Sequence, residues 1–300
     1  MTTEIQLSPA PLTTPSLRNL ARYTAYPALL TGVLGVAAWA IATDQNLSLV
    51  ATLALFATIT LLVLFERLIP YDLDWQPSLR EWMRDGIYFG LNGAVDAITQ
   101  VGVAALAIWV APYLDWGASN LPIVFAAPLA IVIADLAGYW LHRKSHDIPW
   151  LWRIHGVHHA PTKVNAFNNN TVHFLNVAFS TAAKTLPLLV LGFAAEAVFV
   201  AALFLTVQSF AVHANADFRL GALNWLVMGP EHHRLHHSTV LEEAGNHATG
   251  ITLWDVVFGT FTWRPGRTPF AVGTVDPDEF PSPNQIIANA LVPFVSTRKD

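Results

Sequence analysis

The sequence predicts an all-α fold: a multi-pass bundle of four to six transmembrane helices with a histidine-rich helical cap on its cytosolic side. Hydrophobic residues make up 53% of the 300 residues and charged residues only 12%, against roughly 25% charged in a soluble domain. The mean hydropathy is +0.42, and several apolar runs reach the length of a spanning helix. All 12 histidines lie between residues 142 and 247.

The expected spans are apolar stretches of roughly 17 to 25 residues. They cover residues 25–43, 47–65, 87–111, 121–141 and 174–212. The last stretch is long enough for two helices and is interrupted near Gly192, so we expect a hairpin there. Asp44, Gln45 and Asn46 separate the first two stretches and predict a tight turn.

The distribution of basic residues predicts the orientation, because cytosolic loops of membrane proteins are enriched in Lys and Arg. The loops at 44–46, 112–120 and 192–196 contain neither residue, whereas each loop on the opposite side contains Arg. The N-terminus, the C-terminus and all the histidine clusters are therefore expected on the cytosolic side.

The composition also excludes several kinds of site. The chain has no Cys, so disulfides, iron–sulfur clusters and thiolate-bound haem or zinc are excluded. Any metal must be held by imidazole and carboxylate groups. A net charge of −5 without a long basic run gives no indication of nucleic-acid binding.

Eight histidines fall into three clusters with helical spacing, one i, i+4 pair and two i, i+3, i+4 triplets. Residues at these spacings share a helix face, so we expect each cluster to present one set of ligands. Imidazole is the commonest transition-metal ligand, and eight imidazoles exceed what one ion takes. Two metal ions are therefore predicted, with the ligands His142, His146, His155, His158, His159, His233, His236 and His237.

The remaining histidines differ in what their positions predict. His213 ends the last apolar stretch, at the membrane level of the first cluster, and is expected to be a ninth ligand; Asp217 could share its face. His173 is a candidate ligand or a partner of one. His247 has the same two interpretations or is simply a polar loop residue, and His232 is expected to be structural because the triplet already occupies its helix face.

Asp135 lies inside the fourth span, where a carboxylate is costly and is usually paired or functional. It shares a helix face with Tyr139, His142 and His146. Two interpretations stay open: it orients a ligand or a water from the second shell, or a Tyr, Trp or Ser of a neighbouring span satisfies it. For Asp96, in the third span, the second interpretation is favoured.

These motifs resemble those of the fatty acid hydroxylase/sterol desaturase superfamily of integral-membrane di-iron oxygenases. The histidine clusters match its histidine boxes in order and spacing. The other matching positions are Asp135, Asn165, His213-Ala-Asn215, Asn246 and Trp254-Asp255-Val-Val-Phe-Gly259-Thr260. The resemblance implies that the eight box histidines and His213 bind two iron ions, with zinc an alternative in an isolated preparation. It also implies that Asp135, Asn165 and Asn246 form a second shell.

Two positions depart from the superfamily pattern. Phe174 follows His173 where members often have Pro, and His247 stands where they have Tyr or Phe, so the roles of these two histidines stay open.

The resemblance further implies an O₂-dependent oxidoreductase that hydroxylates or desaturates a C–H bond of a lipid, such as a fatty acyl chain, a sterol-like ring or an ether lipid. The chain has no Gly-x-Gly-x-x-Gly, P-loop, haem or flavin motif, so electrons would come from an external reductase, ferredoxin or cytochrome. Two other classes are a zinc-dependent membrane hydrolase, although no His-Glu-x-x-His is present, and a non-enzymatic metal or haem carrier.

We expect three parts along the chain. They are a mobile polar N-terminus at residues 1–24, one membrane-embedded catalytic domain at 25–264, and a Pro-rich tail at 265–300. Within the domain, the cap comprises about residues 142–173 and 213–264. A short apolar segment near 286–295 is too short to span and is expected to lie along the interface or against the cap.

Overall fold

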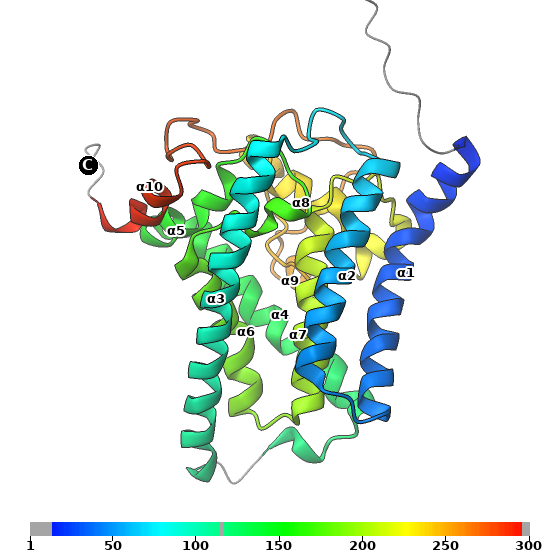
Figure 1. Cartoon of the computed structure of the whole chain (residues 1–300), viewed down its shortest axis with the longest axis vertical. Coiled ribbons are helices and arrows are strands. Elements are labelled where there is room, and N and C mark those ends of the chain that lie inside the picture. The colour runs from blue at the N-terminus through cyan, green and yellow to red at the C-terminus, as the bar shows by residue number, and fades with distance from the viewer. Residues whose placement is uncertain (1–13, 114–116, 296–300) are drawn as a thin grey trace, which may run out of the picture.

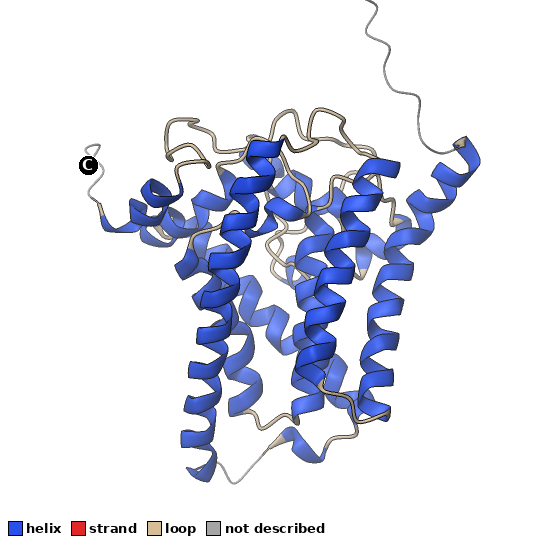
Figure 2. Ribbon diagram, viewed as in Figure 1, coloured by secondary structure: helices blue, strands red, loops and turns tan. Residues whose placement is uncertain are grey.

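The computed structural model describes residues 14–113 and 117–295, and within them the chain forms helices and loops without a strand (Figure 2). Five helices are long and apolar enough to cross a membrane. They are α1 (Pro15–Ala42), α2 (Leu47–Leu68), α3 (Leu79–Val110), α4 (Ile123–Asp147) and α7 (Ala195–His213). The apolar helix α6 (Phe174–Val190) is slightly shorter and runs beside them (Figure 1). The expected all-α multi-pass bundle is confirmed.

Both hairpin turns form where the sequence predicts them. Asn46 caps α2 by accepting a hydrogen bond from the Leu49 amide at 3.0 Å, as Asn commonly does at a helix start. Asp44 in the same turn has a φ of 51°. Gly192, with a φ of 67°, lies in the turn between α6 and α7, where a residue without a Cβ adopts this conformation readily.

Two helices begin earlier than expected. Pro15 occupies the first turn of α1, a position that suits proline because its missing amide has no helical partner there. Residues 15–24, expected to be mobile, are therefore helical, and the rest of that expectation, at residues 1–13, lies outside the described residues. Helix α3 likewise starts at Leu79, ahead of the apolar stretch.

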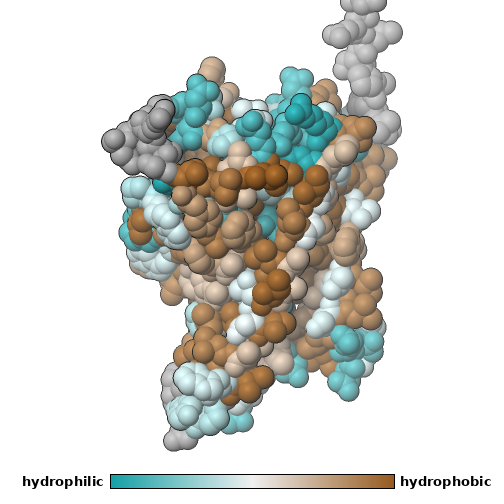
Figure 3. Space-filling view, turned by 60° about the vertical axis from the view of Figure 1, so that its left-hand side comes forward, coloured by the Kyte–Doolittle hydropathy of each residue, from teal (hydrophilic) through white to brown (hydrophobic). Residues whose placement is uncertain are grey.

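Helix α7 is the centre of the bundle. It packs against α1, α2 and α4, whereas α3 packs mainly on α6. Small buried side chains, including Ala130 on α4 and Ala201 on α7, let these helices approach closely. The outer face of α3 is left exposed and apolar, as at Ile98 and Ile108, and Figure 3 shows an apolar flank with hydrophilic side chains towards the ends. Such a flank fits contact with lipid.

The cap is built at one end of this bundle from α5 (Pro149–His159), α8 (Pro230–His236), α9 (Leu253–Val257) and the loops between them (Figure 1). Helix α4 continues out of the bundle into the cap as far as Asp147. Ile148 is extended, with φ −100° and ψ 118°, because a residue before proline is driven out of the helical region. Pro149 then begins α5, so the chain turns sharply between α4 and α5.

The tail packs against the cap, which is one of the two arrangements expected for its apolar segment. This segment forms α10 (Ile286–Leu291) and the 3-10 turn η6 (Val292–Phe294). Arg153 on α5 donates hydrogen bonds to the carbonyls of Val292 and Val295. Phe280 lies over Gly156, where an added Cβ would be 2.2 Å from the Phe280 ring. Residues 296–300 lie outside the described residues.

Candidate metal centre

Nine histidine side chains converge in the cap and form two neighbouring groups. The first group comprises His142, His146, His155, His159 and His236, and the second comprises His158, His213, His233 and His237. Within each group, one ring nitrogen per residue lies within 4.8 Å of the others. The groups are in contact, since the rings of His159 and His237 stack with centroids 4.3 Å apart. These nine are the histidines that the sequence predicts as ligands.

Each histidine triplet is divided between the two groups, which corrects the expectation that one triplet presents one set of ligands. On α5, His155 and His159 belong to the first group and His158 to the second; at α8 the division is reversed, with His236 alone in the first. The reason is helical geometry. At about 100° per residue, position i+4 is rotated by 40° from position i around the helix axis, whereas position i+3 is rotated from i in the opposite direction.

The nitrogens that face into the groups lack the partners that buried polar atoms normally have. The Nε2 atoms of His142, His146 and His236 have no hydrogen-bond partner among the described residues. The Nε2 atoms of His158 and His213 face each other at 3.0 Å. A cation in each group would satisfy these lone pairs at once. An all-imidazole donor set suits iron, zinc, copper or nickel, so the residues fit a pair of transition-metal ions.

Hydrogen bonds on the opposite ring edge orient several of these imidazoles. The Nδ1 atoms of His142 and His236 lie 2.5 Å and 2.8 Å from the carbonyls of His247 and Gly245. Nδ1 of His155 lies 3.1 Å from Oδ1 of Asn176. A donor at Nδ1 fixes the tautomer and leaves the Nε2 lone pair for a metal.

Burial keeps the ligands of the cap neutral. It lowers the pKa of His158 and of His236 to about 4, because charging an imidazole away from water is costly. At neutral pH both rings therefore carry the free lone pair that metal binding requires.

The loop from Gly245 to Thr262 places the backbone carbonyls that hold His142 and His236. Asn246 adopts a φ of 62°, and its side chain exchanges hydrogen bonds with the backbone of Thr262. Asp255 accepts hydrogen bonds from the amides of His247 and Ala248 and from the Thr260 hydroxyl. The motif that follows the third histidine box thus shapes this loop.

Asp135 acts on the same loop from inside the bundle. Its carboxylate accepts hydrogen bonds from the amides of Gly250 and Ile251 at 3.0 Å and 3.2 Å. Its partners are therefore backbone amides, not the histidines or the neighbouring side chains considered from the sequence. His247 has its ring 5.3 Å and 5.4 Å, between centroids, from those of His146 and His236, at the edge of the first group.

The loop after α5 supports the second group. Asn165 and Asn168 exchange reciprocal hydrogen bonds, each from one backbone amide to the other side chain, and Oδ1 of Asn168 lies 3.4 Å from Nδ1 of His213. Glu66, buried at the end of α2, accepts hydrogen bonds from the amides of Ala166 and Asn215. The sequence analysis missed Glu66, Asn168 and Asn176; an acidic residue at the end of an apolar span was the available signal for the first.

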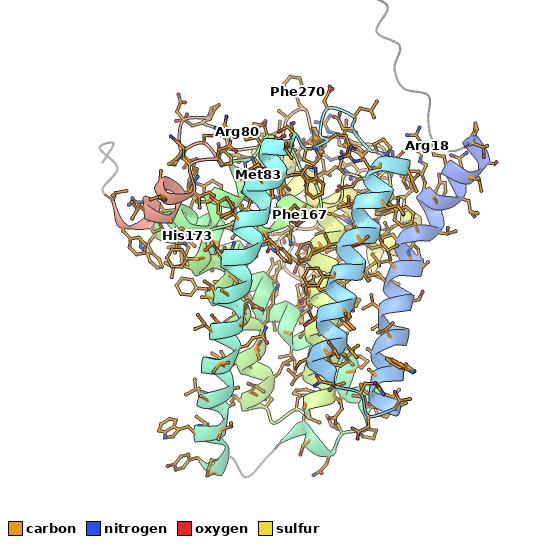
Figure 4. The ribbon with its side chains drawn as sticks, viewed as in Figure 1. Arg18, Arg80, Met83, Phe167, His173 and Phe270 are labelled. Carbon is orange, nitrogen blue, oxygen red and sulfur yellow. The ribbon has the colours of Figure 1, made fainter. Side chains whose placement is uncertain are left out.

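The candidates His173 and Asp217 lie outside both groups, as His247 does, and so does His232, which was expected to be structural. His173 caps α6 by accepting a hydrogen bond from the Leu175 amide, and it lies at the periphery beside α10 (Figure 4). Asp217 forms ion pairs with Arg22 and Arg219. His232 accepts a hydrogen bond from the Gly229 amide at the start of α8, which agrees with the structural role expected for it.

A cavity of about 200 Å³ adjoins the metal centre. His142, His155, His158 and His233 line it together with residues of α4, α6 and α7. The cavity therefore connects both histidine groups to the membrane-spanning part of the bundle.

The fold and the paired histidine groups define a class, the integral-membrane proteins whose histidine boxes form groups that could hold metal ions. The model of the family called Fatty acid hydroxylase matches residues 127–260, a range that includes all nine clustered histidines. Ornithine lipid hydroxylase OlsE of Rhizobium tropici is 31% identical over 257 residues, which cover 83% of this chain and 77% of that protein. The chain belongs to the fatty acid hydroxylase family.

More distant relatives match shorter segments. Human alkylglycerol monooxygenase (Homo sapiens) is 29% identical over 140 residues, 44% of this chain and 29% of its own length. The Delta(7)-sterol-C5(6)-desaturase of Nicotiana tabacum is 28% identical over 197 residues, 61% of this chain and 59% of that protein. No solved structure matches the chain. The relatives are named hydroxylases, monooxygenases and desaturases, so the family is one of oxidoreductases.

Proposed function

We propose that this protein is a membrane-bound oxygenase that holds two iron ions and hydroxylates a C–H bond of a lipid. The observation that carries the proposal is the pair of adjacent all-histidine groups beside a cavity that reaches into the membrane-spanning helices. Bound iron would supply the redox chemistry that activates O₂, which redox-inert zinc does not. Hydroxylation is favoured over desaturation because the relative that covers most of the chain is named a hydroxylase.

The chain's own residues bind the metals, orient the imidazole ligands and position the lipid. Nine neutral imidazoles hold the metals, the carbonyls of Gly245 and His247 orient two of them, and the cavity positions the lipid. Hydroxylation consumes O₂, two electrons and two protons per C–H bond, and one oxygen atom leaves as water. The electrons come from an external donor, which reaches the cap from the cytosolic side according to the loop charges.

The experiment is hydroxylation under ¹⁸O₂ with the iron-loaded protein in vesicles, a lipid extract and a chemical reductant or reductase. We expect a lipid product that carries one ¹⁸O atom, and a variant with both His158→Ala and His236→Ala that forms none. Product oxygen derived from water, or lipid cleavage without O₂ consumption, would instead indicate a hydrolase and reject the proposal.

A further inference from the structure

The cavity beside the metal centre extends along α6 to a lysine. Asn176, which hydrogen-bonds His155, and Lys184 both line it. The eight residue steps from Asn176 to Lys184 correspond to about 12 Å of helix at 1.5 Å per residue. Gly138 on α4 leaves room for this side chain, since a Cβ there would lie 2.8 Å from Cε of Lys184. The cavity therefore has the metal centre at one end and an ammonium group at the other.

Polar side chains outnumber apolar ones in the lining, although apolar atoms make up slightly more of the lining surface. Asn169, Asn170, Ser180 and Ser209 contribute amide and hydroxyl groups. The lining contains no Asp or Glu within the part of the chain that the structure describes. A cavity for hydrocarbon alone is expected to be mostly apolar. This lining favours an occupant that brings hydrogen-bond acceptors.

Lys184 itself lacks a direct acceptor. Asp135 and Asp96 influence it electrostatically, but neither forms an ion pair or hydrogen bond with it among the described contacts. Both carboxylates already accept other hydrogen bonds, Asp135 from two backbone amides and Asp96 from Gln100 and Thr181. An ammonium group at this depth is costly unless acceptors surround it, so its three donors remain for a ligand.

We propose that Lys184 binds an anionic oxygen group, a carboxylate or a phosphate, of the lipid that occupies the cavity. The inference rests on the proposed function, because it takes the occupant to be the substrate. The anionic group is held at the far end of the cavity, and a carbon about 12 Å away meets the metal centre. Lys184 thereby selects lipids with an acidic group over neutral lipids and sets which carbon is presented.

The test is equilibrium binding to the purified full-length protein in detergent, measured by native mass spectrometry. The probes are tetradecanoate, tetradecyl phosphate and the neutral methyl tetradecanoate. We expect at least one anion to bind about tenfold or more tightly than the ester, as charge-assisted hydrogen bonds predict. Lys184→Met should remove this preference, and Lys144→Met, the same change at an exposed lysine outside the lining, should retain it. The anion that binds more tightly shows whether Lys184 prefers a carboxylate or a phosphate.

Equal binding of acids and ester by the unaltered protein, or an unchanged preference in Lys184→Met, would overturn the inference. The comparison of probes on the unaltered protein decides the matter even where Lys184→Met fails to fold, and Lys184→Gln provides a second variant. Because binding needs no turnover, a protein that prefers the anions but forms no oxygenated lipid would contradict the proposed function, and only the anion-binding role of Lys184 would stand.

Discussion

The two nitrogens of several imidazole rings have different roles in this cluster. One nitrogen faces the group, where His142, His146 and His236 leave Nε2 without a partner. The other is held from behind, as in the contacts of His142 and His236 with backbone carbonyls. Neither burial nor an unpartnered nitrogen distinguishes a candidate ligand, because His232 is equally buried and its Nε2 also lacks a partner among the described residues. The nine candidates are distinguished by their convergence, since one ring nitrogen per residue lies within 4.8 Å of the others in its group.

His236→Ala should lower the metal content to about one ion per chain or less and abolish oxygenation, because it removes one nitrogen of the first group and leaves the others without a full set. His232→Ala is the matched control on the same helix and should keep both metals. Metal analysis of the purified variants measures this. Equal metal loss in both variants would contradict the assignment.

Acid should destabilise the metal-free protein. An exposed imidazole has a pKa of about 6.5, and burial lowers the pKa of His158 and His236 to about 4. Between these values the unfolded chain binds protons that the folded chain does not, so the free energy of unfolding decreases as the pH falls. Above pH 7 both histidines are neutral in the folded and in the unfolded chain, so the free energy of unfolding is not reduced by their protonation.

The measurement is the thermal midpoint of the metal-free protein at pH 7.5 and pH 5. A lower midpoint at pH 5 is expected, with a smaller change in the metal-loaded protein at the same pH values. A midpoint that rises on acidification would show that these imidazoles are charged in the fold.

At the level of elements, the loop between α8 and α9 is the part that fixes the first group. It supplies the carbonyls behind two candidate ligands, and hydrogen bonds to Asp255 of α9 and to Asp135 of α4 hold its backbone. Gly245 sits in close contact there, since a Cβ at this position would lie 2.2 Å from the carbonyl oxygen of Thr260. The backbone, not a flexible side chain, occupies that space.

Gly245→Ala should therefore distort the loop, misplace His236 and reduce metal binding. We expect a loss of stability of about 1–3 kcal/mol, the usual range for overpacking. Gly90→Ala, on α3 with open space around it, is the control and should keep the metal content and midpoint. Metal analysis and thermal unfolding of both variants provide the comparison; normal metal content in Gly245→Ala would exclude the role given to this loop.

The sequence predicted the spans and the nine converging histidines because apolar length and helical spacing are local properties. It could not predict how the triplets divide between the two histidine groups, since that depends on how α4, α5, α7 and α8 pack. The sequence could not predict the backbone partners of Asp135 for the same reason, because they are the amides of Gly250 and Ile251, more than a hundred residues away. Lys184, a charge within an apolar span, was visible in the sequence but was missed.

For the whole molecule, the cap with the two histidine groups lies at one end of the helix bundle (Figure 1), and the flank of the bundle is apolar (Figure 3). The absence of Cys from the sequence makes its orientation directly measurable. Gln45, in the α1–α2 turn, and Glu242, in the cap, are both exposed and lie at opposite ends of the fold.

With Gln45→Cys and Glu242→Cys as single variants, a membrane-impermeant maleimide added to intact cells should label the first. The second should be labelled only after the membrane is opened, because the loop charges predict a cytosolic cap. The reverse pattern would contradict the proposed orientation without affecting the metal centre.

The central claim, that the two histidine groups hold a pair of irons that oxidise a lipid with O₂, is tested most directly by one combined measurement. Iron per chain is determined on the purified protein, and O₂ uptake is followed on the same sample with reductant and lipid. The account predicts two irons per chain and uptake that depends on lipid. Stoichiometric zinc with no O₂ uptake, in a preparation supplied with excess iron, would contradict it.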